Sequence, residues 1–386
     1  MGDTIVFSKP SDDKVTDGHP PHYTELPTSL ELQSELAPQF IQQYWPQALK
    51  TASHLADWEF KNLIFCGCGD SHHASYALSY AFSNWTKHQT QGLHAMEAAR
   101  YAIPRSSGSN HLVVGISASG ETARTIEAVQ LARESGARTL GITTDSASTL
   151  AAEAESTFAL ELPEQPFGPG LISYLAALLA GYAIGVQKTD ASLQEQIHST
   201  ISEMPEALSA WIEAQSRVGQ EAAQRADPTQ PILFVGSGPV RGTAMFAAAK
   251  VIEAAGQPAS SQDVEEWAHL EYFIEPSQLP IWLLGAGGRT SGREHEIVRA
   301  AKQLGHNLIL SEWSYGPDSL REDLSALALW AGPTAYANSL MARIGEQPFR
   351  EFGGGRSQEE GGGVSRIRTS QQLGSLKDLS KFYPPN

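Results

Sequence analysis

Short apolar runs alternate with helical stretches along most of the chain. Asn62–Cys66, His111–Ile116 and Thr139–Thr143 are such runs, and a helical pattern at Ala123–Ser135 separates the last two. Buried strands separated by helices of roughly 10–15 residues predict a parallel sheet covered on both faces. We therefore expect an α/β fold with doubly wound, flavodoxin-like parallel sheets.

Apolar residues at helical spacing precede the first of these strands, from Leu30 to Tyr44. They predict one helix from Ser29 to Pro46 and a second from Pro46 to Asp57, because a proline inside a helical pattern usually ends or kinks the helix.

The same layout recurs in the second half of the chain. Pro231–Val235, Ile281–Leu284 and Asn307–Leu310 are apolar runs, and a helical pattern at Thr243–Ala255 follows the first of them. Sequential strands separated by helices again predict a parallel sheet.

Two pairs of landmarks show a near-constant offset between the halves. Gly69 and Gly238 lie 169 residues apart, and Val114 and Leu284 lie 170 apart, which indicates a tandem duplication. The acidic helical stretch near 187–214 would link the copies. We expect four segments, namely a polar lead-in over 1–28, a first domain over 29–195, a second over 196–345, and a Gly-rich tail over 346–386 that is either disordered or folded over a site.

Charge and composition narrow the function classes. The chain has 43 acidic and 27 basic side chains, a net charge of −16, which argues against a nucleic-acid partner or an anionic membrane surface. Two cysteines cannot make a disulfide framework, and a bridge between Cys66 and Cys68, which are separated by one residue, is geometrically poor. Leu171–Val186 is too short to span a membrane, and the first residues show no signal-peptide pattern. We expect a cytoplasmic enzyme or binding protein without a membrane anchor.

The turn Ser117-Ala118-Ser119-Gly120-Glu121-Thr122 follows a strand and precedes a helix, where parallel sheets bind ligands. Its hydroxyls and the N–H groups of the helix N-terminus suit a phosphate. The alternative is that Ser119 or Thr122 simply caps the helix. The duplicate favours a ligand, because Gly287, Arg289 and Gly292 stand at the corresponding positions there and the hydroxyls occur in one copy alone.

The sequence supports two other kinds of site, a dinucleotide site and a metal site, more weakly. The Gly-x-Gly turns lack the last glycine of a dinucleotide fingerprint, since His72, Arg241 or Thr290 stands there. Cys66, Cys68, His72 and His73 have no second ligand pair at zinc spacing. We expect no nucleotide cofactor and no metal.

Two pairs of residues suggest proton transfer. Lys250 and Glu253 are three apart, as are Glu266 and His269, so each pair would share a helical face. The alternatives are a surface ion pair and a solvated helix. A carboxylate and an imidazole in one pocket can move a proton between adjacent carbons and open a sugar ring.

These motifs resemble those of a known protein family. The Ser117–Thr122 loop, the Cys68-Gly69-Asp70-Ser71 turn and the tandem repeat are similar to the sugar isomerase (SIS) domain proteins, above all the isomerase half of glucosamine-6-phosphate synthase, over roughly residues 30–345. The resemblance implies a phosphosugar aldose-ketose isomerase that transfers a proton between C1 and C2. It leaves open an amino-sugar phosphate deaminase or deglycase, and a sugar-phosphate sensor without catalysis remains a rival from another class.

The resemblance also implies roles for individual residues. Glu253, beside Lys250, would be the catalytic base, and His269 of the Glu266-Trp267-Ala268-His269 segment would reach the site across a homodimer interface to assist ring opening. The sugar phosphate would lie on the two loops of the first domain, at Gly69, Ser71, Ser117, Ala118, Ser119 and Thr122.

The sequence differs from the family pattern at three places, which limits how far the family's residue roles can be assigned to this chain. Ala118 replaces a glutamine of the synthase, and Gly170-Leu171-Ile172 replaces a Ser-Thr-Lys segment, so a sulfonate could take the place of the phosphate. In the tail, Lys381 is similar to a lysine that can form an imine with the ketose, although Arg356 is an equally placed alternative.

Overall fold

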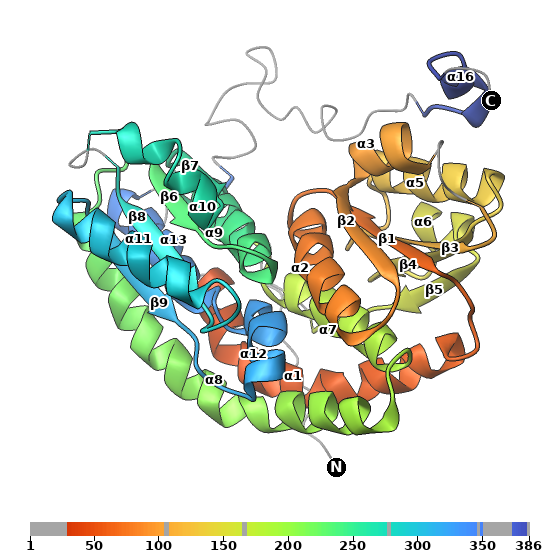
Figure 1. The fold of residues 1–386 in the computed structure, drawn as a ribbon, viewed down its shortest axis with the longest axis horizontal. Helices are drawn as coiled ribbons and strands as arrows, with labels where there is room; N and C mark the ends of the chain where they lie inside the picture. The colour runs from red at the N-terminus through yellow and green to blue at the C-terminus, as the bar shows by residue number, and fades with distance from the viewer. Residues whose placement is uncertain are drawn as a thin grey trace, which may run out of the picture.

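The computed structural model describes residues 29–103, 108–163, 168–275, 279–345, 348–349 and 373–383. The lead-in 1–28 and the tail position Arg356 lie outside the described residues. Figure 1 shows two α/β halves that stand side by side on long shared helices. Among the described residues, none of the helices combines the length and the apolar character that crossing a membrane requires.

Within the described residues, the first half contains a five-stranded sheet of order β2-β1-β3-β4-β5, and its strand pairs are parallel. This order is that of a flavodoxin-like sheet, as expected. The strands are β1 (Asn62–Gly67), β2 (Gln89–His94), β3 (His111–Ile116), β4 (Arg138–Thr143) and β5 (Ser156–Ala159).

The second half repeats this order with four described strands, β7-β6-β8-β9, again parallel. The α/β, doubly wound architecture predicted for both halves is confirmed. The strands are β6 (Ile232–Val235), β7 (Ala259–Gln262), β8 (Ile281–Gly285) and β9 (Leu308–Glu312).

Helices cover both faces of each sheet (Figure 1). In the first half the helical segments are α1 (Ser29–Ala52), η1 (Ser53–Leu55), α2 (Asp70–Trp85), α3 (Ala95–Glu97), the π-helical η2 (Ala98–Ala102), α5 (Ala123–Glu134), α6 (Thr149–Glu153) and α7 (Ile172–Val186). The later ones are α8 (Ala191–Arg225), α9 (Pro239–Ala255), α10 (Val264–Trp267), η3 (Glu271–Phe273), α11 (Ser291–Gln303), α12 (Asp318–Leu324), η5 (Ser325–Leu327), α13 (Ala331–Ile344) and α16 (Leu376–Ser380).

The break expected at Pro46 does not occur. Helix α1 runs without interruption through Pro38 and Pro46. Tyr44, Trp45 and Ala48 around the second proline are buried, so packing of this segment offsets the hydrogen bond that the proline cannot make.

The predicted domain boundary at residue 195 falls inside α8, a helix of 35 residues. This helix packs against α1 and α13, and Figure 1 shows α1 and α8 running beneath both halves. The stretch expected to be a linker is therefore a structural support that the two halves share.

Each sheet turns one face toward a common core. In β1, Leu63 and Phe65 pack into the core shared by both halves, whereas Ile64 and Cys66 pack against α5, η2 and α16. The second sheet alternates in the same way, and Phe234 of β6 belongs to the shared core. Strand alternation thus builds one continuous apolar layer between the halves.

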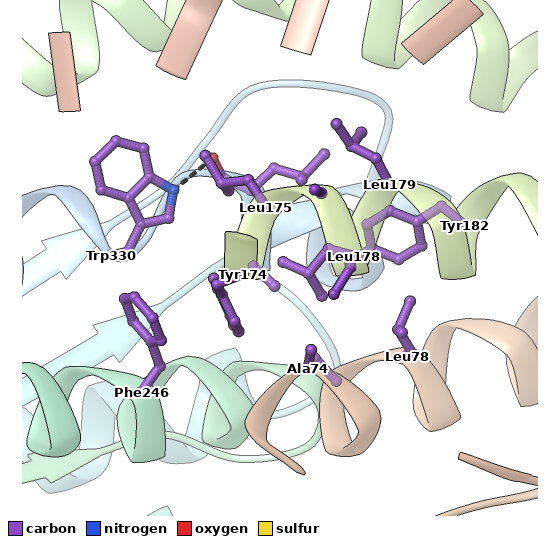
Figure 2. Close-up of a cluster of buried hydrophobic side chains, with 14 of the residues drawn as sticks. Ala74, Leu78, Tyr174, Leu175, Leu178, Leu179, Tyr182, Phe246 and Trp330 are labelled. Atoms are coloured by element: carbon purple, nitrogen blue, oxygen red, sulfur yellow. Dashed lines mark hydrogen bonds between the residues drawn. The ribbon is translucent and has the colours of Figure 1, made fainter. Parts of the chain in front are cut away.

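Figure 2 shows this layer where α2, α7 and α9 meet. Tyr174 of α7 stacks on Phe246 of α9, with ring centroids 4.1 Å apart. A Cβ at Gly242 of α9 would lie 2.8 Å from the His73 carbonyl oxygen of α2, so only glycine permits this approach of the two helices. This close contact fixes the position of α9, and of its side chains, relative to the first sheet.

Candidate active site

A pocket of about 930 Å³ lies at the carboxyl ends of the strands of the first sheet and extends to α9. It contains most of the predicted substrate-binding residues and the predicted base. Among the described residues, its lining includes Gly69, Ser71, Ser117, Ala118, Ser119, Thr122 and Glu253.

The 117–122 turn is held by its own hydrogen bonds. The hydroxyls of Ser117 and Thr122 lie 2.9 Å apart, and Ser117 Oγ also accepts the Gly120 N–H. Ser119 Oγ accepts the Glu121 N–H at 3.2 Å, upstream of the helix. Gly120 has a φ of 68°, and a Cβ there would overlap Ser148. The turn is thus preshaped around the start of α5.

The capping interpretation of this turn is wrong for Thr122. Thr122 is the N-cap of α5, but its side chain makes no cap hydrogen bond and pairs with Ser117 instead. A hydroxyl that lines a pocket and does not cap its helix is better placed to contact a ligand.

The preceding turn brings Ser71 to the same pocket. Gly69 has a φ of 56°, a conformation that favours glycine, and it is the N-cap of α2. A Cβ at Gly67 would lie 2.5 Å from Ser71 Cβ, so the small residue lets the start of α2 approach the strand end.

Glu253 is oriented by a buried lysine. Lys250 Nζ donates to Glu253 Oε2 at 2.5 Å and to Asp70 Oδ2 at 2.6 Å, and its side chain is fully buried. The surface-ion-pair alternative for Lys250 and Glu253 is therefore wrong. Asp70 comes from α2 and Glu253 from α9, so a single ammonium group joins the two halves at the pocket.

The charges in this cluster support one another. Burial disfavours the charged form of Lys250, but the Asp70 and Glu253 carboxylates outweigh it and raise the lysine pKa. Burial likewise opposes ionisation of Asp70, yet the Lys250 charge and His73 lower its pKa. Lys250 is therefore charged at neutral pH and cannot act as a proton acceptor, which leaves a carboxylate to do so.

Several pocket residues were missed by the sequence analysis. Asp70, Arg100, Arg124, Ser173 and Tyr174 also line the pocket. Ser173 supplies a hydroxyl just after the segment in which the sequence analysis found one missing. Arg124 carried a usable signal, because a cation in the first turn of a helix opposes the helix dipole. Arg100 lies in the π-helix, where neither periodicity nor spacing points to a ligand.

Three predicted residues lie away from this pocket in the described structure. Glu266 lies in the short helix α10, which ends at Trp267, and His269 lies in the turn that continues from it, where its N–H donates to the Glu266 carbonyl. The His269 side chain is 66% exposed and its Nε2 lies 3.2 Å from Glu265 Oε1, while Glu266 is exposed. Lys381 is exposed beside the Phe382 ring, at the end of α16.

In the part of the chain that is described, no group of three or more His, Cys, Asp or Glu side chains is arranged so that it could hold a metal ion. Burial raises the pKa of the Cys66 thiol to about 12, with a smaller effect from Cys68. A thiol that stays protonated at neutral pH is a packing residue rather than a nucleophile.

Comparison with known proteins agrees with this architecture. The SIS domain model matches residues 55–186. The glutamine–fructose-6-phosphate aminotransferase (isomerizing) of Corynebacterium glutamicum is 27% identical over 242 residues, which are 61% of this chain and 38% of that protein. The chain thus spans about two fifths of the length of the curated relatives that it matches.

Solved structures share the fold of both halves. The C-terminal domain of glucosamine-fructose-6-phosphate aminotransferase from Francisella tularensis superposes with a TM-score of 0.71 at 16% identity, covering 83% of this chain and 98% of that one. Tagatose-6-phosphate ketose/aldose isomerase from Escherichia coli gives 0.69 at 15% identity, covering 83% and 94%.

Proposed function

We propose that this chain, whose residues 55–186 belong to the SIS domain family, is a phosphosugar isomerase that transfers a proton between C1 and C2 of an open-chain sugar. The observation that carries the proposal is that the hydroxyl-lined turn and the Lys250-bound Glu253 face one pocket from opposite halves of the molecule. The first domain (29–195) would hold the anion, and the second (196–345) would supply the base.

The turn at 117–122 anchors the phosphate in this proposal. The hydroxyls of Ser119 and Thr122 donate to its oxygens, and the N-terminus of α5 adds a favourable field. Ser71 contributes a further hydroxyl from the adjacent turn. Anchoring the phosphate at one end of the sugar leaves C1 and C2 toward Glu253.

Glu253 carries out the chemical step. Its carboxylate removes a proton from the carbon next to the carbonyl, giving an enediol, and returns that proton to the neighbouring carbon. The hydroxyl proton moves from one oxygen to the other, so the sugar is isomerised without net gain or loss of atoms. Lys250 holds the carboxylate in one orientation through its hydrogen bond.

Ring opening needs a second proton carrier, and we propose that it comes from a second copy of the chain. Among the described residues, the pocket lining contains no histidine. His269 is exposed, and the residues after it, Leu270, Tyr272, Phe273 and Ile274, are apolar or aromatic and exposed as well. Such a segment suits a homodimer contact that would place His269 of the partner subunit at the pocket.

A proton-exchange experiment tests the function. The protein is incubated in deuterated water with a panel of ketose, aldose and amino-sugar phosphates, and NMR follows deuterium at C1 and C2. We expect exchange with at least one compound, and a decrease of roughly 10²–10⁴-fold in Glu253→Gln with binding retained. Glu213→Gln, in an exposed ion pair on α8, is the matched control and should exchange like the wild type.

Two outcomes would overturn the proposal. Binding of a sugar phosphate without exchange of any panel member would identify a sensor. Ammonia release from an amino sugar as the main reaction would identify the deaminase activity that the family resemblance left open.

A further inference from the structure

Asp70 lines the pocket, and the proposed reaction has so far given it no role. It is the first residue of α2, in the first half of the molecule. Its Oδ2 accepts a hydrogen bond at 2.6 Å from Nζ of Lys250, which belongs to α9 in the second half. The same ammonium group donates to Glu253 Oε2. Two carboxylates, one from each half, therefore share a single cation.

Lys250 depends on these carboxylates because its side chain is fully buried. A buried ammonium group is costly unless it is paired with a negative charge. The face of the Phe246 ring also lies near it, with the centroid 4.9 Å from Nζ, but a cation–π contact is weaker than a pair with a carboxylate. Burial lowers the pKa of Lys250, and Asp70, more than Glu253, raises it. Asp70 is thus the principal counter-ion of the lysine.

The proposed proton transfer removes the other counter-ion during each turnover. When Glu253 takes a proton from the substrate carbon, the electron pair of the broken C–H bond stays on the substrate, which becomes an enediolate. Glu253 is then a neutral acid, and Lys250 lies beside it as a buried cation. Neutralising one partner of a buried ion pair is strongly unfavourable when the other partner is left without a counter-ion. A second, permanent negative charge removes this obstacle.

Asp70 can supply that charge because it stays ionised. Burial opposes ionisation of Asp70, but the Lys250 charge and His73, whose Nδ1 lies 3.7 Å from Asp70 Oδ1, lower the pKa of this carboxyl. Its other oxygen, Oδ2, is engaged by Lys250. Asp70 is therefore suited to hold the lysine and not to exchange a proton with the substrate.

We propose that Asp70 is the permanent counter-ion of Lys250 and that its charge allows Glu253 to accept the substrate proton. The inference rests on the proposed function, in which Glu253 is the base. With Asp70 present, protonation of Glu253 takes these three side chains from a charge of about −1 to neutral. Without Asp70, the same step would create a buried positive charge. Asp70 acts through Lys250 and is a positioning residue.

The test measures kcat and KM for proton exchange, using the panel compound that the wild type exchanges. Asp70→Asn should lower kcat at least about tenfold, because Glu253 becomes a weaker base. KM should stay within about threefold. The pH below which kcat falls should move down by about one unit, since a negative charge near the base is lost.

Other titratable and charged groups near Asp70 or along the pocket are the same in wild type and variant, so they do not account for a difference in the pH profile. They are His73, Arg100, Arg124 and Tyr174. The matched control is Asp318→Asn, which changes the first residue of α12, an exposed aspartate paired with Arg321. This variant should exchange like the wild type.

A double variant separates this role from a merely structural one. Lys250→Met removes the cation, so no counter-ion is needed, and adding Asp70→Asn in that background should change kcat less than about twofold. Asp70→Glu keeps the charge and should retain more activity than Asp70→Asn. Thermal melting shows whether each variant is folded, and Asp70→Ser replaces Asp70→Asn if the latter does not fold.

Three outcomes would overturn the inference while the proposed function stands, provided that the wild type exchanges and Glu253→Gln does not. The first is a kcat of Asp70→Asn within about twofold of the wild type. The second is an equal loss in the wild-type and Lys250→Met backgrounds. The third is a rise in KM alone, which would make Asp70 a substrate contact. Absence of exchange by the wild type with every panel compound would instead overturn the proposed function.

Discussion

The two halves of the molecule share a fold, but their equivalent turns have opposite surroundings. Gly69 and Gly238 both have a φ of 56° and both are N-caps, of α2 and α9, as expected for duplicated units. In the first half the turn at 117–122 lines an open pocket with hydroxyls. In the second half, the turn after β8 is filled by the protein's own side chains.

In the second half, the positive charge at the turn after β8 is neutralised by carboxylates of the same chain. Arg289 pairs with Glu322 and lies 3.6 Å from Asp323, and Glu322 is nearly buried. A Cβ at Gly288 would lie 2.3 Å from the Glu322 carboxyl carbon. A carboxylate of the chain thus occupies the surroundings in which the first half would hold a ligand. The difference teaches that equivalent turns of the two halves can either line an open pocket, where we propose that an anion binds, or pack against side chains of the same chain.

The largest expected difference between the turns lies in ligand affinity. Ser119→Ala combined with Thr122→Val removes two hydroxyl donors to a charged group, each worth roughly 1.5–3 kcal/mol, so fructose 6-phosphate should bind at least about 100-fold more weakly. Thr290→Val in the second turn, which loses a bond to Glu294, is the matched control and should leave affinity unchanged. Calorimetry measures both, and equal losses in the two variants would remove the proposed distinction between the turns.

Asp323 should show the next largest effect, as a pH dependence of stability. Burial raises the pKa of Asp323 to about 6, although hydrogen bonds from Asn84 and Trp85 and the Arg289 charge act against it. The folded protein thus binds this proton more tightly than the unfolded chain. The stability that Asp323 contributes below about pH 4 is therefore lost as the pH rises through about 6.

Asp323→Asn should remove that loss, because an amide oxygen can still accept the bonds from Asn84 and Trp85. Relative to the wild type, the variant should gain up to about 3 kcal/mol in unfolding free energy between pH 4 and pH 7. Urea unfolding across this range measures the difference, with the exposed Asp318→Asn as control. A difference that stays flat with pH would contradict the role assigned to burial.

A smaller effect is expected when the internal carboxylate of the second turn is neutralised. Glu322→Gln should lower the unfolding free energy by about 1 kcal/mol, because Arg289 is half exposed and such pairs are weak. Added sulfate should restore part of this loss in the variant and not in the wild type, since Arg289 then has one carboxylate fewer beside it and can bind an anion. Thermal melts with and without sulfate give the answer, and identical salt responses would show that the second turn is no latent anion site.

The smallest effect is expected in the tail. Lys381→Ala should leave the turnover rate within about twofold of the wild type, because Lys381 is exposed beside Phe382 and does not line the pocket. A rate assay on the substrate found by proton exchange measures this. A loss of more than about tenfold would reinstate imine chemistry at this lysine.

Local sequence patterns were enough to predict most of the fold and about half of the candidate site. β1, β3 and β8 are continuous apolar runs and were predicted to within a residue. β2, β5 and β7 were not predicted, because they are edge strands in which most residues are half buried or exposed. Periodicity gives a weak signal for a strand whose residues are at most half buried.

The rest of the site depends on contacts between segments far apart in sequence. Lys250 donates a hydrogen bond to Asp70 although the two residues lie 180 positions apart in the sequence, so no local pattern predicts this pair. Arg100 reaches the pocket from a π-helix, and its partner Glu127 lies in α5. By contrast, Lys250 and Glu253 share one face of α9, so their spacing was enough.

The shared helical base has a consequence for the order in which the chain can fold during synthesis. Helix α1 leaves the ribosome before the other described helices, yet it packs against α7, α8 and α13, the last of which ends at Ile344. The first sheet can form early, but its supporting helix waits for most of the chain. The pocket itself is completed only once Glu253 has emerged and α9 has docked on α2. A truncated nascent chain therefore holds the 117–122 turn without Glu253, the base proposed to act beside it.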